Sequence, residues 1–162
     1  MVVKFNIVTT DQLDLAHLAL FVGQRVNELV VSRLAKMGFD RVRESHGYLI
    51  QHLIGGERSI TELAKRMEVT QQAASKAVNE LVNLGVLESV TAKDRRAKRI
   101  RLSRRGWECV RLTRHVRAGF DKRLMAAVGK TTYGRTKAAL NDCLEELGGL
   151  ERILHRRVRA PQ

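Results

Sequence analysis

Hydrophobic and polar positions follow a helical period over most of this 162-residue chain. After a short extended lead over 1–8, apolar residues recur every three or four positions within about 9–37 and again within about 41–53. Gly38 is expected to end the first of these helices, and Gly55 with Gly56 to end the second. The pattern therefore predicts two helices in the first third of the chain.

The first predicted helix is apolar on nearly all sides between Leu13 and Val22. Residues 9–11 supply capping groups, and Asp14 adds a favourable negative charge in the first turn. A helix that is apolar all round needs burial on more than one face. One face is expected to pack on its own chain, and the other on a partner chain.

The stretch 59–103 predicts two short helices followed by a pair of strands. Ser59 and Glu62 form a capping box for the first helix, and Thr70 is the expected N-cap of the second, which ends near Gly85. The apolar sides of the two helices are expected to consist of Leu63, Ala64, Met67, Ala74, Ala77, Val78 and Leu81. The strands are predicted over 86–91 and 99–103, where Ile100 and Leu102 alternate with arginines.

Two more helices are predicted after the strands. One covers 104–128 and is broken at Gly129, and Thr131 or Thr132 is expected to cap the last. The last helix carries an apolar stripe of Ala138, Leu140, Leu144, Leu147 and Leu150. A stripe on a terminal helix is typical of a packing surface, which a second subunit can cover.

Composition narrows the class of partner. The net charge is +13 and the sequence pI is about 10.7, which favours a polyanionic partner such as DNA, ribosomal RNA or a membrane surface. The hydrophobic fraction of 44% argues against disorder. No proline- or serine-rich linker divides the chain, so one domain over 1–162 is expected.

The residues carry no catalytic motif: no Gly-rich phosphate loop, no H-E-x-x-H and no nucleophile elbow. Cys109 and Cys143 lie far apart, without metal-binding spacing to the five histidines, and are expected to be half-buried thiols in a reducing cytosol. Neither a signal peptide nor a membrane-spanning apolar run is recognisable. We expect a cytoplasmic protein that is not an enzyme and holds no metal or cofactor.

The outer face of the second short helix is polar but mostly uncharged. It presents Gln71, Gln72, Ser75, Lys76 and Asn79, whose donors and acceptors suit base edges in a major groove. The tip between the strands has five cationic residues among the seven of 93–99, which suits phosphates or a narrow minor groove. Each feature alone is typical of a solvated surface. A helix-turn-helix followed directly by a basic hairpin favours DNA binding.

These residues resemble the MarR family of bacterial transcription regulators. The wing motif of that family is similar to 94–99 here, followed by Ile100-Arg101-Leu102-Ser103 and Gly106. The upstream match includes Leu63-Ala64, Ser75, Leu81, Leu84-Gly85 and Val86-Leu87. Ala97 replaces the aspartate of the stricter motif and Ser103 replaces the commoner threonine.

The resemblance implies roles for particular residues. Arg96 matches the wing arginine that enters the minor groove, and Asp94 the acid that holds the wing in shape. Arg95, Lys98 and Arg99 are expected to neutralise phosphates. Lys93 in the wing and Thr70 at the start of the reading helix are further candidate DNA contacts. Relatives are usually repressors that release DNA when a small aromatic or phenolic ligand binds. In this chain the corresponding pocket is expected to involve His17, Phe21, Arg25, Tyr48 and His52.

The sequence as a whole predicts a mainly α fold with a small β-hairpin wing. A winged helix-turn-helix over about 41–103 is flanked by dimerisation helices over about 9–37 and 104–157. The expected function is a sequence-specific transcriptional regulator, a homodimeric repressor released from an inverted repeat in double-stranded DNA by a small-molecule effector. The alternative is an architectural nucleic-acid-binding protein without sequence preference.

Overall fold

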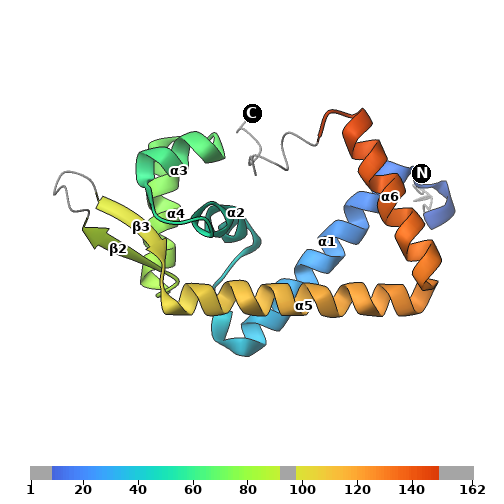
Figure 1. Ribbon diagram of the computed structural model, residues 1–162, viewed down its shortest axis with the longest axis horizontal. Helices are drawn as coiled ribbons and strands as arrows, with labels where there is room; N and C mark the ends of the chain where they lie inside the picture. Colours follow the sequence, from blue (N-terminus) through green and yellow to red (C-terminus); the bar gives the residue numbers. More distant parts are fainter. Residues whose placement is uncertain (1–8, 92–97, 150–162) are drawn as a thin grey trace, which may run out of the picture.

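The computed structural model describes residues 9–91 and 98–149 and is mostly helical, with a small antiparallel sheet at one end (Figure 1). In chain order the elements are η1 (Thr10–Gln12), α1 (Leu15–Leu34), η2 (Ala35–Phe39), α2 (Glu44–Leu53), β1 (Arg58–Ser59), α3 (Ile60–Met67), α4 (Gln71–Asn83), β2 (Leu87–Thr91), β3 (Lys98–Leu102), α5 (Arg104–Val128) and α6 (Lys130–Glu146). The predicted fold class is confirmed: a winged helix-turn-helix flanked by long helices.

The helix-turn-helix begins where its capping residues predict. The Ser59 hydroxyl accepts a hydrogen bond from the Glu62 N–H (3.2 Å), and the Glu62 carboxylate accepts one from the Ser59 N–H (2.7 Å). At the start of α4 the Thr70 hydroxyl accepts from the Ala73 N–H at 3.1 Å. These bonds satisfy backbone donors that the first turn of a helix leaves unpaired.

The start of the first long helix differs from the prediction. Asp14 is itself the N-cap of α1, because its carboxylate accepts from the His17 N–H at 2.9 Å. The capping groups of 9–11 belong instead to the short turn η1, which an extended Leu13 separates from α1. Gly38, with a φ of 86°, bends the chain after α1, as predicted.

The sheet has a third strand that the sequence did not predict. Its order is β1-β3-β2, and β1 pairs antiparallel with β3 through Arg58 and Ile100. Two residues are too few to show an alternating pattern, so this strand has no local signal. Ile100 and Leu102 are buried, as their alternation predicts.

The core joins the winged helix-turn-helix to the two long helices. Leu49, Leu53, Leu63 and Leu81 are almost fully buried. The C-terminal part of α1 joins this cluster through Val30 and Leu34, and the N-terminal part of α5 through Cys109 and Val110. In Figure 1, α5 extends from the winged helix-turn-helix across the molecule to α6, and α1 crosses against it.

The C-terminal helices follow the prediction in part. Ser103 caps α5, and Gly129 ends it with a φ of 84°. Gly129 also precedes α6, which begins at Lys130, so the predicted capping role of Thr131 or Thr132 is wrong. α6 ends at Glu146, and residues 150–162, including Leu150 of the predicted stripe, lie outside the described residues.

Candidate DNA interface and the adjacent cavity

α4 has one buried and one exposed face. Ala74, Val78 and Leu81 are buried, with Ala77 partly buried beside them. On the other face the predicted residues share one surface depression, lined by Gln71, Gln72, Ser75, Lys76, Asn79, Glu80 and Asn83. Of the predicted contacts, Ser75 is half-buried and the others are exposed. This face presents amide, hydroxyl and ammonium groups at neighbouring positions, which suits the donor and acceptor pattern of base edges.

Thr70 lies at the tip of this helix and is exposed. Its hydroxyl oxygen already accepts the capping hydrogen bond from Ala73. Its structural contribution is therefore to fix where α4 begins.

The wing, which we define as strands β2 and β3 with the residues between them, is described only along its strands. Lys93, Asp94, Arg95 and Arg96 lie outside the described residues, so their predicted roles stay predictions. Lys98 is exposed at the start of β3. Cationic residues at this end of a winged helix suit phosphate contacts.

Arg99 has carboxylate neighbours that the sequence did not indicate. Its guanidinium nitrogens lie 3.9 Å from Glu57 and 3.7 Å from Glu62, and its side chain is 35% exposed. Two acids therefore offset much of the charge predicted to meet phosphate. The neighbouring pair of Arg101 and Glu88 (2.7 Å) links β3 to β2.

A polar cluster joins α4 to the start of α2. His46 is 3% exposed, and its Nε2 lies 3.1 Å from a carboxylate oxygen of Glu80 on α4. The His46 Nδ1 accepts from the Arg43 backbone N–H at 3.2 Å, so in the neutral ring Nε2 carries the proton and donates to Glu80. The guanidinium of Arg43 also pairs with Glu80. The hydrogen bond from His46, together with the charge of Arg43, lowers the pKa of Glu80.

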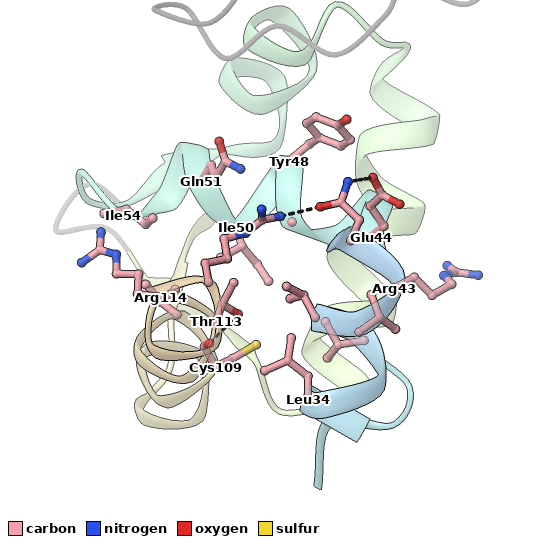
Figure 2. Close-up of a pocket in the computed structure, with 17 residues that line it drawn as sticks. Leu34, Arg43, Glu44, Tyr48, Ile50, Gln51, Ile54, Cys109, Thr113 and Arg114 are labelled. Atoms are coloured by element: carbon pink, nitrogen blue, oxygen red, sulfur yellow. Dashed lines mark hydrogen bonds between the residues drawn. The ribbon is translucent and has the colours of Figure 1, made fainter. Parts of the chain in front are cut away.

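A cavity of about 360 Å³ lies between α1, α2 and α5, next to this cluster. Its apolar wall includes Val30, Leu34, Val42, Ile50 and Val110, and its polar rim includes Asn27, Arg43, Glu44, Tyr48, Gln51, Thr113, Arg114 and Arg117. At the rim the Arg117 guanidinium donates to the Asn27 side chain (2.6 Å), whose amide donates to Glu44 (2.6 Å) (Figure 2). An apolar cavity with charged groups at its edge suits a small organic ligand.

The predicted pocket residues are spread along the molecule. Tyr48 lines the cavity. His17 pairs with Asp14, Phe21 is 52% exposed, and Arg25 pairs with Glu28, all on α1. His52 is buried on α2. Among the described residues these four do not line the cavity, whereas Arg114 and Arg117 of α5, which were not predicted, do.

Apolar side chains remain exposed on the long helices. On α1 they are Leu15, Leu18, Leu20, Phe21 and Val22; α5 adds Leu124 and Val128, α6 adds Leu140, and Leu147 follows α6. Leu20 and Phe21 are adjacent in the sequence and therefore lie on different sides of α1. Both are nevertheless about half exposed, at 53% and 52%. An exposed apolar surface of this extent is typical of a protein interface.

Two absences concern residues 9–91 and 98–149. In that part of the chain, no group of three or more histidine, cysteine, aspartate or glutamate side chains is arranged to hold a metal ion. Nor does that part contain a helix that is both long and apolar enough to cross a membrane.

The MarR family model matches residues 42–97, which span α2 to the tip of the wing. The winged helix-turn-helix of this chain is thus similar to that of the MarR family. The matched range includes α4 and β2 and ends one residue before β3. Among curated protein sequences, none matches this chain.

Solved structures of MarR-type regulators share the fold over most of the chain. MepR, a transcription regulator of the Staphylococcus aureus multidrug efflux pump MepA, is 15% identical with a TM-score of 0.68, over 83% of this chain and 99% of that chain. YusO from Bacillus subtilis is 18% identical with a TM-score of 0.67, over 85% and 99%. A mutant of S. aureus MepR bound to an oligodeoxyribonucleotide is 16% identical with a TM-score of 0.62, over 83% and 99%. The chain therefore has the fold of a MarR-family transcriptional regulator.

Proposed function

We propose that the protein is a sequence-specific regulator that binds double-stranded DNA through α4 and the wing. The exposed polar face of α4 carries this proposal, because it combines uncharged side chains that can hydrogen-bond to bases with one lysine. The opposite face of α4 is buried and anchors the helix in the core. The net charge of +13 supplies attraction to phosphates. A MepR mutant of the same fold is bound to an oligodeoxyribonucleotide, which supports DNA binding by this chain.

We infer a homodimer from the apolar surface on α1, α5 and α6. A two-fold axis repeats the same surface on both subunits, so one set of apolar side chains covers the other. Two copies of α4 then enter successive major grooves about 34 Å apart. The target is an inverted repeat, and the whole chain works as one unit in which the long helices hold the two winged helix-turn-helix regions in register.

A small-molecule effector is the third part of the proposal. The cavity between α1, α2 and α5 has an apolar wall and arginines at its rim, which suits an aromatic or phenolic anion. A ligand that binds the DNA-free conformation more tightly releases the operator, as a repressor requires. No enzymatic activity is proposed.

Footprinting on DNA that flanks the gene for this protein, with nonspecific competitor present, tests the proposal. We expect one protected inverted repeat whose half-sites are about one helical turn apart. Uniform, competitor-sensitive binding along every fragment would contradict it and favour the architectural alternative.

A further inference from the structure

One side chain belongs to both of the sites described above. Arg43 is part of the rim of the cavity, and Glu80, its partner in the ion pair, lines the surface depression on α4. In Figure 2 the Arg43 side chain extends from the edge of the cavity away from it. One ion pair therefore connects the cavity with the surface depression on α4, although Arg43 and Glu80 are 37 residues apart in the chain.

His46 fixes the geometry of the ion pair between Arg43 and Glu80. The buried ring accepts from the backbone of Arg43 and donates to the same carboxylate oxygen that Arg43 contacts. A Glu80 carboxylate that loses the guanidinium keeps the His46 ring as its donor. Glu80 then has a different set of partners and a different preferred position. Because Glu80 lies one helical turn beyond Lys76 and next to Asn79, its position affects the face of α4 that meets DNA.

We propose that an anionic group in the cavity competes with Glu80 for Arg43, and that this competition couples the cavity to DNA binding. This rests on the proposed function and adds the residue that transmits the signal. The occupant is a small carboxylate or phenolate, because those anions pair with guanidinium groups in the way Glu80 does. In the DNA-binding form Arg43 pairs with Glu80, as it does in this structure. In the ligand-bound form its side chain turns toward the cavity and pairs with the anion instead.

The chain offers a way to place the competing anion without knowing the ligand. Gly47 lines the cavity four residues after Arg43, and a Cβ added there meets no atom within 4 Å. Arg43 is the N-cap of α2, and Gly47 lies in the first turn that follows it. Gly47→Asp therefore adds a tethered carboxylate near Arg43, and Gly47→Asn adds the same shape without the charge.

The experiment measures DNA affinity for Gly47→Asp and Gly47→Asn, each alone and combined with Arg43→Met. We expect Gly47→Asp to bind about tenfold more weakly than Gly47→Asn, as a coupling of ordinary size gives. In the Arg43→Met background the difference should fall below about twofold, because the shared cation is gone. An equal difference in both backgrounds, or no difference in either, overturns the competition.

Two further variants separate the ion pair from general electrostatics. Glu80→Gln makes the protein more positive, so charge alone predicts tighter DNA binding, whereas loss of the pair predicts weaker binding. Arg111→Met removes one exposed charge on α5, as Arg43→Met removes one at the N-cap of α2. We expect Arg43→Met to weaken binding several-fold more than Arg111→Met, and equal effects would overturn the proposed role of Arg43.

Hydrogen exchange distinguishes failure of the proposed coupling from failure of the proposed function. Failure of the wild-type protein to select any DNA would remove the regulator proposal. In DNA-free protein, Gly47→Asp should still speed amide exchange around Glu80, and only when Arg43 is present. Unchanged exchange in α4 would overturn the coupling even if the wild-type protein binds an operator.

Discussion

At the scale of single residues, the exposed face of α4 combines two kinds of chemistry. Asn79 can accept and donate to one base edge, whereas Lys76 is a mobile positive charge. We predict that Asn79→Ala weakens operator binding by about 1–3 kcal/mol and relaxes the preference at one base pair. Lys76→Ala should weaken binding to all sequences and reduce the slope of log K against log salt by about 1.

Matched variants on α6 serve as controls for those two substitutions. Asn141 and Lys137 are exposed residues of the same types, outside the winged helix-turn-helix. Asn141→Ala and Lys137→Ala should leave the preference for each base pair unchanged in competition binding. An Asn79→Ala variant with wild-type specificity would remove that residue from the reading face.

The reactivity of Cys109 is set by its buried environment. It is 2% exposed, and burial raises the pKa of its thiol. The thiolate is the reactive form, so we predict that a thiol reagent modifies Cys109 only as fast as the fold opens. The measurement uses a Cys143→Ser variant with and without urea, and complete labelling within the mixing time in native buffer would contradict the buried position.

At the scale of elements, the close approach of α5 to the helix-turn-helix depends on a glycine. A Cβ at Gly106 would collide with the carbonyl oxygen of Val86 and lie 3.0 Å from Leu102 Cδ2. We predict that Gly106→Ala lowers the free energy of unfolding by about 1–3 kcal/mol, because backbone must move. Gly119, on the same helix, has open space, so Gly119→Ala should raise it by about 0.5–1 kcal/mol.

Urea unfolding of both variants measures these two changes. A stabilising Gly106→Ala would show that α5 does not pack this closely on the loop before β2. A destabilising Gly119→Ala would show that the exposed side of α5 is covered in solution.

The elements also show which features a sequence can predict. Helix starts at Ser59, Thr70 and Ser103 are predictable because a cap depends on residues within one turn. β1 is not, because its two residues become a strand only by pairing with β3, about 40 positions away. The arginines around the cavity were missed for the same reason: their role depends on α1, α2 and α5 meeting, which local periodicity does not encode.

At the scale of the whole molecule, the exposed apolar face predicts a dimer. Phe21 is 52% exposed near the end of the apolar part of α1. We predict that Phe21→Glu shifts the protein from dimer to monomer, because a carboxylate would be buried without a partner in the interface. Light scattering after size exclusion gives the mass directly.

Met37 supplies the control for the dimer prediction. It is 43% exposed in η2, outside the apolar surface on α1, α5 and α6. Met37→Glu should therefore leave the dimer intact. A wild-type mass of one subunit at micromolar concentration would contradict the proposed homodimer and the inverted-repeat target with it.

Sequence-specific DNA binding is tested most directly by the affinity ratio between the protected sequence and a scrambled duplex of equal composition, measured across a salt series. With a net charge of +13, affinity for both duplexes should fall as salt rises. Reading by α4 predicts a ratio of about 10³ or more that persists at the highest salt. Equal affinities for the two duplexes at every salt concentration would contradict the assignment of α4 as a reading helix.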